Sequence, residues 1–441
     1  MPKGLRTLAF SFDDAHLTHF SGLVLLQRFC QQLRLRWLLQ RDVLPPQVTG
    51  DFQPADLLLA LIYVLVAGLK RVSKTQILQY NGAFLCLLGL ERFPDPSSLR
   101  RFLQRISPHT IRQLVRLHDR LRAALGEVPR ARSTLLLDLD AVVITLYGRQ
   151  QGARLGYNPK KKGRRSYHPL LCFEAHGQEF WHGSLRPGNT SANTGVIGFL
   201  ERCAAKLPSR VARTRVRLRA DAGFFGGKLL GFLEANRWGY VIVAKQYPTI
   251  RRRALSARFE KLGGGWEAGE FSHQAHGWPK ARRFVVVRRP VPEDPQEAAQ
   301  LRLLTHRRYA YSVLVTNLKL SPWRVWRCYI GRARVEKTIR ELLYDLPLSQ
   351  IPTAQWLANV AFFQTLMLAY NLVHWFKRLC LPKSYGAATV ETVRRDFLAV
   401  PGRLVNRGHR HVLHLPRDYP WREELLGAAR AIRKLRLRQK I

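Results

Sequence analysis

Carboxylates are scarce in this sequence of 441 residues. It holds 30 Asp and Glu against 73 Lys and Arg, which leaves a formal charge of +43 at pH 7. Hydrophobic residues make up 46% of the chain and aromatic residues 10%, so this is a folded protein and not a disordered basic tail. Such a charge excludes most enzymes that act on small neutral substrates. It favours a polyanionic partner, most often nucleic acid and less often an anionic membrane or ribosomal RNA.

Cysteine pairs and long apolar runs are also missing. The six cysteines are scattered with none at CxxC spacing, which argues against a zinc ribbon, a zinc finger or a disulfide framework. The longest apolar run, Ala55–Leu69, contains Asp56 and is short for a bilayer crossing, so we expect a buried helix there. The first residues lack the apolar segment of a signal peptide. We therefore expect a cytoplasmic protein without a membrane partner.

Up to about residue 128 the apolar spacing predicts helices. In Leu23–Leu39 apolar residues recur every three or four positions, with Arg and Gln between them. Asp56–Lys70 is apolar on nearly all sides, and Val72–Leu88 predicts a third helix with Ser73 as its N-cap. We therefore expect an all-α N-terminal domain.

A short basic helix follows a break in this pattern. Asp95 has the position of an N-cap and Pro96 that of the first helical residue, which predicts a helix over Ser97–Ile106. This helix carries three arginines, Arg100, Arg101 and Arg105. Together with the preceding Ala83–Gly89, it fits a helix-turn-helix that reads DNA. It fits a helical bundle with a solvated basic face equally well.

The pattern changes to strands alternating with helices after Ser133. We expect three strands, a helix, a strand, a helix and a strand, in turn over Thr134–Tyr147, Pro169–Phe173, Glu179–Leu185, Thr194–Ala205, Val211–Ala220, Gly226–Asn236 and Tyr240–Ala244. This is the element order of a ribonuclease-H-like α/β sheet. A β-rich stretch follows at 246–318, then helices from Pro322 to Cys380, and a basic, mixed end.

Because acids are rare, aspartates within an apolar strand are informative. Asp138 and Asp140 are two residues apart, so both lie on one face of the expected strand. A buried carboxylate is costly unless it is paired or bound to metal, so these acids either form ion pairs with nearby arginines or serve a metal site. Asp221 ends the fourth expected strand, where it either caps the following element or joins the other two.

A further acid, Glu336, lies on an expected helix over Tyr329–Asp345. Spacings of three and four residues place it on one face with Tyr329, Arg332 and Arg340. Carboxylates on neighbouring elements can hold two Mg²⁺ ions about 3.5–4 Å apart for phosphodiester chemistry, and such a site usually needs a third acid. The same spacing also fits a solvated face with ion pairs between turns.

These residues and their surroundings resemble a known family, the bacterial insertion-sequence transposases of the DDE type that carry a β-rich insertion. The resemblance covers the chain from about Leu17 to Pro420. It rests on Leu137–Leu171 with LRPGNTSANTG (Leu185–Gly195) behind it, on RADAGFF (Arg219–Phe225), and on the tyrosine-arginine-glutamate signature at Tyr329, Arg332 and Glu336, followed by Leu357–Leu372.

The resemblance implies a ribonuclease-H-like catalytic core with two Mg²⁺ ions, for which Mn²⁺ can substitute. It also implies three catalytic, metal-binding carboxylates, which map onto Asp140, Asp221 and Glu336. Asp138 is the alternative first acid, or supports the site from the same strand face. The long gap between the second and third acids is what an inserted β-rich domain produces.

Two positions depart from the family's pattern. Val142 stands where Ser or Thr is common, and Leu343 where the signature usually has Lys, although Arg340 on the same helical face can take over phosphate contact. These departures keep open a second function, that of a catalytically inert DNA-binding protein derived from a transposase. A basic RNA-binding or ribosome-binding protein is a third reading, which the aspartates within the strand disfavour.

The resemblance further implies double-stranded DNA, both transposon ends and target, as the partner of a homodimer, and a nucleoid-associated place in a bacterial cytoplasm. The expected DNA contacts are Tyr329, Arg332, Arg340, Arg100, Arg101, Arg105, Lys160, Lys161 and Lys162. Other basic clusters, such as Arg213–Arg219 and Arg282-Arg283, fit either phosphate contact or a solvated face. Trp266 and Trp278 fit either stacking on a flipped base or the core of a small β domain.

The expected organisation has five parts. They are a helical DNA-end-binding domain (1–128), the first part of the catalytic domain (129–245), the β-rich insertion (246–318), a helical second part of the catalytic domain that carries the glutamate (319–400), and a basic C-terminal segment (401–441).

Overall fold

The computed structural model describes residues 10–45, 52–90, 92–126, 134–291, 304–306, 309–408 and 410–436. Contacts divide the chain into two compact units. The helical unit combines the chain up to Leu117 with Tyr344–Thr353 and the part after Leu357, whereas the sheet unit covers His118–Leu343 with Ala354–Trp356. The expected domain boundary between residues 128 and 129 lies outside the described residues.

The N-terminal part of the helical unit consists of helices and one very short strand. Its elements are β1 (Leu17–Thr18), α1 (Leu23–Gln32), α2 (Leu35–Asp42), α3 (Pro54–Ala67), the 3-10 helix η2 (Val72–Tyr80), α4 (Gly82–Leu88), α5 (Pro96–Arg105) and the first part of α6 (Pro108–Leu125). The strand β1 pairs antiparallel with the C-terminal strand β15 (Gly402–Arg407). This part of the chain is therefore not purely α-helical, in contrast to the all-α domain that we expected.

Two of the expected helices are each divided in two. Arg34 adopts a left-handed backbone conformation, with φ of 54°, which separates α1 from α2 within Leu23–Leu39. Val72–Leu88 is a 3-10 helix followed by α4. Asn81 caps α4, because its side chain accepts a 2.9 Å hydrogen bond from a backbone amide three residues on. The expected cap, Ser73, lies inside the 3-10 helix instead.

The basic helix α5 begins at Pro96, as expected. The side chain of the N-cap residue Asp95 makes no cap hydrogen bond and instead accepts one from Gln79. The apolar side chains of Leu99 and Phe102 are buried, and α5 packs against η2 and α3. Arg101 and Arg105 are exposed, whereas Arg100 is half-buried.

The C-terminal part of the helical unit contains α13 (Trp356–Cys380), η6 (Lys383–Ala387), α14 (Val390–Val393), the π-helix η7 (Arg394–Leu398), β15, β16 (Arg410–His414) and α15 (Arg422–Lys434). Within the described part of the chain, α13 alone is long and apolar enough to cross a membrane, and 83% of its most apolar stretch is buried inside the protein. The shorter apolar helix α3 is also buried along nearly its whole length, which confirms the helix expected there.

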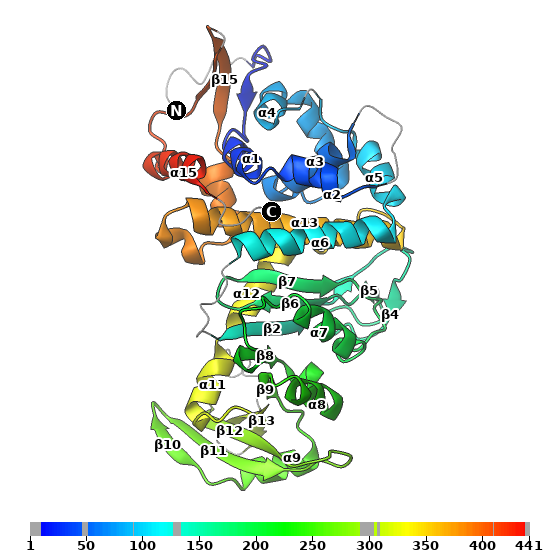
Figure 1. Ribbon diagram of the computed structural model, residues 1–441, viewed down its shortest axis with the longest axis vertical. Helices are drawn as coiled ribbons and strands as arrows, with labels where there is room; N and C mark the ends of the chain where they lie inside the picture. The colour runs from blue at the N-terminus through cyan, green and yellow to red at the C-terminus, as the bar shows by residue number, and fades with distance from the viewer. Residues whose placement is uncertain are drawn as a thin grey trace. The chain divides into compact units, whose positions relative to one another are not determined.

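The sheet unit is built around a ten-stranded sheet whose main path runs β10-β11-β12-β14-β9-β8-β2-β6-β7, with β13 beside β14 (Figure 1). Its first strands are β2 (Leu135–Ala141), β6 (Leu170–Glu174), β7 (Glu179–Ser184), β8 (Val216–Ala220) and β9 (Gly239–Val243). Strand β2 is parallel to β8 and antiparallel to β6, and β8 is parallel to β9. The strand and helix order expected between residues 134 and 244 holds for the strands of this sheet. The expected first strand, Thr134–Tyr147, is however divided into β2 and β3 (Ile144–Thr145), and two further short strands lie where none was expected.

Helices cover both faces of this sheet. They are α7 (Val196–Ala204), α8 (Gly227–Ala235) and α9 (Pro248–Leu255) on one face, and α11 (Pro322–Ile330) on the other. Alternate residues of β2 and β8, such as Leu137 and Leu218, belong to the core beneath α7 and α8. The residues between them therefore point to the opposite face.

The β-rich segment continues the same sheet and does not form a sheet of its own. Its strands are β10 (Glu260–Gly263), β11 (Trp266–His273), β12 (Arg282–Pro290), β13 (Leu304–His306) and β14 (Tyr309–Thr316). Strand β14 pairs antiparallel with β9, which joins the segment to the central strands. A small separate sheet contains β3 (Ile144–Thr145), β5 (Arg165–Tyr167) and β4 (Arg154–Leu155). The chain continues from α11 into α12 (Ala333–Arg340) and a π-helix, η5 (Glu341–Asp345).

Candidate active site

The register of β2 and β8 brings the first two expected acids to the same end of the sheet. In this parallel pair Asp138 lies opposite Arg219, and Leu139 opposite Ala220. Continued by one residue, the register places Asp140 beside Asp221. Asp221 keeps an extended backbone, with φ of −80° and ψ of −178°, so it prolongs the line of β8.

Both acids point away from the core beneath α7 and α8. Leu139 and Ala220 are fully buried in that core, and side chains alternate along a strand. Asp138, Asp140 and Asp221 therefore share the face that carries α11. The side chain of Asp221 also accepts a 2.9 Å hydrogen bond from the amide of Gly223, so the capping role that the sequence allowed is present.

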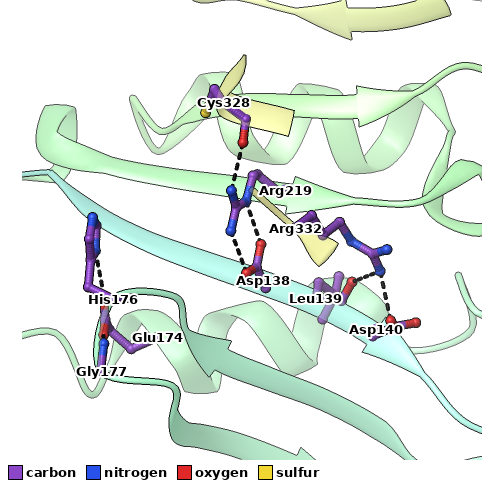
Figure 2. A network of polar contacts seen from close by, with 9 residues as sticks. All are labelled: Asp138, Leu139, Asp140, Glu174, His176, Gly177, Arg219, Cys328 and Arg332. Atoms are coloured by element: carbon purple, nitrogen blue, oxygen red, sulfur yellow. Dashed lines mark hydrogen bonds and ion pairs between the residues drawn. The ribbon is translucent and has the colours of Figure 1, made fainter. Parts of the chain in front are cut away.

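Asp138 is closed within an ion pair (Figure 2). Its two carboxylate oxygens each accept a 2.6 Å hydrogen bond from Arg219, which also donates to the carbonyl of Cys328 at 2.6 Å. The Asp138 side chain is fully buried and that of Arg219 is 4% exposed. Burial raises the pKa of Asp138, and the hydrogen bonds from Arg219 oppose that rise. Both oxygens of Asp138 are therefore engaged inside the protein.

Asp140 has a looser partner. One of its oxygens lies 2.9 Å from the guanidinium of Arg332, which also donates to the carbonyl of Leu139 at 3.1 Å (Figure 2). Burial raises the pKa of Asp140 to about 6. Arg332 opposes this rise, whereas the negative charges of Asp221 and Glu336 add to it. Asp221 and Glu336 are therefore close enough to Asp140 for their charges to act on it.

The helix that carries the signature residues Tyr329, Arg332 and Glu336 is broken between the first and the last of them. The expected helix over Tyr329–Asp345 is interrupted, because α11 ends at Ile330 and α12 begins at Ala333. Gly331 occupies the break, where a Cβ atom would lie 2.7 Å from the nearest guanidinium nitrogen of Arg219. A larger side chain would therefore push against the buried ion pair.

Electrostatics link the signature to the two aspartates. Burial raises the pKa of Tyr329, and the charges of Asp221, Glu336 and Asp140 raise it further. Arg332 is buried; burial lowers its pKa, but the charge of Asp140 and its other neighbours more than reverses this. Glu336 is exposed on α12. The structure thus brings together Asp140, Asp221, Arg332, Tyr329 and Glu336 within the sheet unit.

The donor set suits a hard divalent cation, which prefers carboxylate oxygens. Two like charges at adjacent positions raise the pKa of Asp140, and a bound cation would relieve that repulsion. In the part of the chain that the structure describes, no three His, Cys, Asp or Glu side chains are arranged to hold a metal ion. Since Arg332 engages one oxygen of Asp140, that ion pair must loosen for the oxygen to bind metal.

Comparison with known proteins gives these residues a family. The chain matches the family model described as transposase DDE domain group 1 over residues 2–437. It belongs to this family.

Two solved transposase structures are similar to this DDE-family chain. A cryo-EM structure of the piggyBac transposase synaptic complex with hairpin DNA shares 13% identity at a TM-score of 0.40, over 86% of this chain and 87% of that one. A crystal structure of a pre-cleavage Mos1 transpososome shares 12% identity at a TM-score of 0.17, over 50% of this chain and 77% of that one. No curated protein sequence matches the chain.

The remaining expected DNA contacts of the DDE-family chain form no described contact with the acids of the site. Lys160, Lys161 and Lys162 are exposed on the loop between β4 and β5, and Arg340 is exposed at the end of α12. The three arginines of α5 belong to the helical unit. These positions are accessible to a large ligand, and their roles remain predictions.

Two basic clusters that the sequence offered for phosphate contact are partly used inside the protein. Arg219 is paired with Asp138, and Arg282 with Glu234 at 2.8 Å. Both arginine side chains are nearly fully buried, so these two are unavailable to DNA. Sequence alone could not separate them from exposed neighbours, because their acidic partners are distant along the chain.

The two tryptophans of the β-rich segment are partly buried. Trp266 packs against Trp326 with ring centroids 5.4 Å apart. Trp278 stacks on Phe284 at 6.2 Å, and Arg282 lies over its ring. This packing favours the core role of the two alternatives. Two polar residues at the sheet edge, His168 and Arg186, were not singled out from the sequence.

Proposed function

We propose that this protein is an active transposase that binds the inverted repeats at the ends of a mobile element and catalyses metal-dependent strand cleavage and strand transfer. The observation that carries the proposal is the placement of Asp140 beside Asp221 at one end of the β2–β8 pair in a DDE-family chain, close enough to Glu336 for its charge to act on Asp140. A protein that only bound phosphates would gain nothing from acids placed where they repel DNA.

A ribonuclease-H-like catalytic core is part of this proposal. The central order β7-β6-β2-β8-β9 supports it, because β6 is antiparallel to both β7 and β2, whereas β2, β8 and β9 are parallel to one another. In such a sheet the carboxyl ends of β2 and β8 lie at one edge, where Asp140 and Asp221 are found. The β-rich segment then extends the sheet beyond β9.

Divalent metal ions are generally used by this family, and Asp140, Asp221 and Glu336 would hold them. We propose two Mg²⁺ ions, with Mn²⁺ as a substitute, which when bound activate water and stabilise the leaving oxygen of a phosphodiester. The protein's own part is to hold the carboxylates. Arg332 keeps Asp140 oriented and partly neutralised in the free protein, and the pair of Asp138 and Arg219 anchors β2 to β8 beneath it.

Double-stranded DNA is the proposed partner. A formal charge of +43 makes counterion release a large driving force for binding, so affinity should fall steeply with salt. The exposed arginines of α5 are the proposed readers of the ends, since a bidentate arginine–guanine contact gives about 1–3 kcal/mol of discrimination. We also propose a homodimer that pairs two ends, formed on DNA because the free chains repel one another.

Reading by α5 is tested by substitution of its arginines. Removal of the first 128 residues would not be a clean test, because the helical unit also includes the chain after Leu357. Arg101→Ala and Arg105→Ala should instead reduce the preference for end DNA over random duplex. Lys161→Ala should weaken binding to both duplexes alike. An unchanged preference in both α5 variants would place the reader elsewhere.

Catalysis is tested on the DNA that flanks the gene. Short inverted repeats there define the end duplexes, and purified protein with Mg²⁺ should cleave them and join the 3′ ends to target DNA. Asp221→Asn should bind the ends with equal or slightly higher affinity but leave them uncut. Glu260→Gln, an exposed acid on β10, is the matched control and should cut normally.

Val142 and Leu343, the two departures from the family's pattern, leave a second function open, that of a catalytically inert DNA-binding protein. If the wild-type protein binds the ends but leaves them uncut in both Mg²⁺ and Mn²⁺, the protein is a DNA-binding derivative of a transposase. If it shows no preference for the ends, both functions are wrong.

A further inference from the structure

Four strand ends meet at the edge of the sheet that holds the acids. Strands β2 and β8 finish there, next to Asp140 and Asp221. Strand β6 begins there and β7 ends there, since Ala141 pairs with Leu170 and Leu170 with Ser184. His168 precedes β6 and Arg186 follows β7 at this same edge. Arg186 is the second residue of the stretch LRPGNTSANTG (Leu185–Gly195).

The backbone holds Arg186 in a defined position. The amide of His168 donates to the carbonyl of Arg186 at 2.9 Å, and the Arg186 Nε donates to the carbonyl of His168 at 2.9 Å. Its Nη1 donates to the carbonyl of Thr194 at 2.8 Å. The loop in between is pressed close to β5, because a Cβ on Gly188 would lie 2.2 Å from the Ser166 carbonyl oxygen.

Arg186 is a buried cation without an anion. The residue is 8% exposed, and no described carboxylate forms an ion pair with it. Its Nη2 is buried and has no hydrogen-bond partner among the described residues. Burial lowers the pKa of Arg186 to about 10, which keeps it charged at neutral pH. A buried charge of this kind destabilises the free protein unless another group compensates for it.

The compensating anion would lie close to the acids. The backbone connects the two, because the amide of His168 donates to the carbonyl of Arg186 and the carbonyl of the next residue, Pro169, accepts a 3.1 Å hydrogen bond from the amide of Val142, two residues past Asp140. The His168 Nδ1 lies 2.6 Å from the Thr190 carbonyl, which orients the ring within the same loop. Arg186 thus lies near the strand ends that carry the acids, and the charges of both Arg186 and Asp221 act on the His168 ring.

We infer that Arg186 forms a binding site for a single DNA backbone phosphate beside the scissile one, in which Nη2 donates to a non-bridging oxygen. Because Nη2 is buried in the free protein, the side chains that cover it must move aside when DNA binds. This rests on the proposed function for the identity of the anion, and on the structure alone for the site. Arg186 is a positioning residue: it fixes the strand next to the carboxylates and takes no part in the reaction itself. Guanidinium groups suit this role because they donate to phosphate with fixed geometry.

The experiment places one neutral methylphosphonate at a time in the end duplex, at each phosphate within a few nucleotides of the cut. In the wild-type protein one non-scissile position should slow cleavage by about 10- to 100-fold, the range of a lost charge-assisted hydrogen bond. Arg186→Gln should slow cleavage of the unmodified duplex by a similar factor and become insensitive to that one substitution. Arg186→Lys should retain part of the rate, and Arg210→Gln, an exposed arginine of the same unit, should match wild type.

A merely structural role for Arg186 would slow cleavage at every position alike and leave the methylphosphonate pattern unchanged, which would overturn the inference. So would a wild-type pattern in which no phosphate other than the scissile one is sensitive, a result that needs no variant to fold.

A second measurement separates the site from the proposed function. Sodium sulfate, compared with sodium chloride at equal ionic strength, should raise the melting temperature of wild type and of Arg210→Gln more than that of Arg186→Lys. If wild type cleaves no end duplex but this difference is found, the anion site stands and the function fails. If the ends are cut but the difference and the sensitive phosphate are both absent, the function stands and the site fails.

Discussion

Two neighbouring positions on the β2–β8 pair carry the same residue type and have opposite environments. At the inner position Asp138 faces Arg219, and every oxygen of the carboxylate is hydrogen-bonded inside the protein. At the outer position, two residues on, Asp140 adjoins a second aspartate, Asp221; one of its oxygens pairs with Arg332 and the other accepts a 2.8 Å hydrogen bond from the amide of Ala141. One step along the strands changes a closed ion pair into a pair of like charges.

The difference shows how a strand can hold one acid for stability and another for chemistry. The inner pair ties two parallel strands together in a dry layer, where an unpaired charge would be costly. The outer pair lies at the end of the strands, where burial, and after it the charge of Asp221, raises the pKa of Asp140. Perturbed carboxylates at a strand end are typical of functional sites, whereas compensated ones inside a sheet are typical of structure.

The sharpest way to break this comparison is to neutralise the outer acid. Asp140→Asn should lower strand cleavage by more than about 100-fold, since even residues that only support a metal ligand change activity by 10- to 100-fold. The variant should fold as well as wild type, because it removes a charge that the site repels. Cleavage of end duplex and a melting curve on the same preparation check both statements. Normal cleavage by Asp140→Asn would mean that Asp138, and not Asp140, is the first catalytic acid.

The inner acid should respond in the opposite sense. Asp138→Asn leaves the Arg219 charge buried without a partner and should cost about 3–5 kcal/mol in the free energy of unfolding. The double variant Asp138→Leu with Arg219→Met should cost less than the single one, because it removes both charges and keeps apolar volume. Urea unfolding of the three proteins measures this. A loss below about 1 kcal/mol in Asp138→Asn would mean that Arg219 finds compensation elsewhere.

Sequence reasoning found the acids but could not distinguish them. The spacing of two placed Asp138 and Asp140 on one face, and the alternation of strands and helices predicted the central sheet. The partner of Asp138 lies 81 residues away on another strand, so nothing near Asp138 in the sequence identifies it. Ion-pair and metal roles were therefore both left open. The structure shows the ion pair at Asp138, and the metal role of Asp140 is a proposal.

The helix of the signature was less predictable still. A continuous face from Tyr329 to Arg340 assumed one helix, but the chain breaks between α11 and α12. Gly331 was the only local sign of a break, and the reason for it is tertiary, the close approach of Arg219. Arg186 escaped notice for a similar reason, because the lack of an anionic partner is a property of the fold and not of the sequence near it.

A pH series of the free energy of unfolding tests the same comparison without an activity measurement. The pKa of Asp140 is raised from 3.8 to about 6 in the folded protein, so between these values the folded state holds a proton that the unfolded state has lost. The stability contributed by the protonated form is complete below pH 3.8 and is lost as the pH rises through 6, by about 3 kcal/mol in all.

Asp140→Asn, which cannot ionise, should lack this fall. Without divalent metal, its free energy of unfolding relative to wild type should therefore increase between pH 4 and pH 7. Added Mg²⁺ should reduce the difference, because a cation stabilises the ionised carboxylate. A difference that is flat with pH would mean that the charge of Asp140 is already compensated by Arg332.

The smallest expected effect comes from a single methyl group at the break. Gly331→Ala introduces a Cβ 2.7 Å from the guanidinium of Arg219, which is held by Asp138 and by the Cys328 carbonyl and has little freedom to move. The φ of Gly331 is −60°, so the backbone itself tolerates alanine and any loss reflects the contact. We expect a cost of about 1–3 kcal/mol, the range for an overpacked core.

Gly231→Ala within α8 is the matched control, since a Cβ there meets nothing within 4 Å. It should stabilise the protein by about 0.5–1 kcal/mol, because alanine favours a helix over glycine. Equal effects of the two substitutions in unfolding experiments would show that the inner ion pair is not held as tightly as its geometry indicates, and the contrast between Asp138 and Asp140 would then rest on exposure alone.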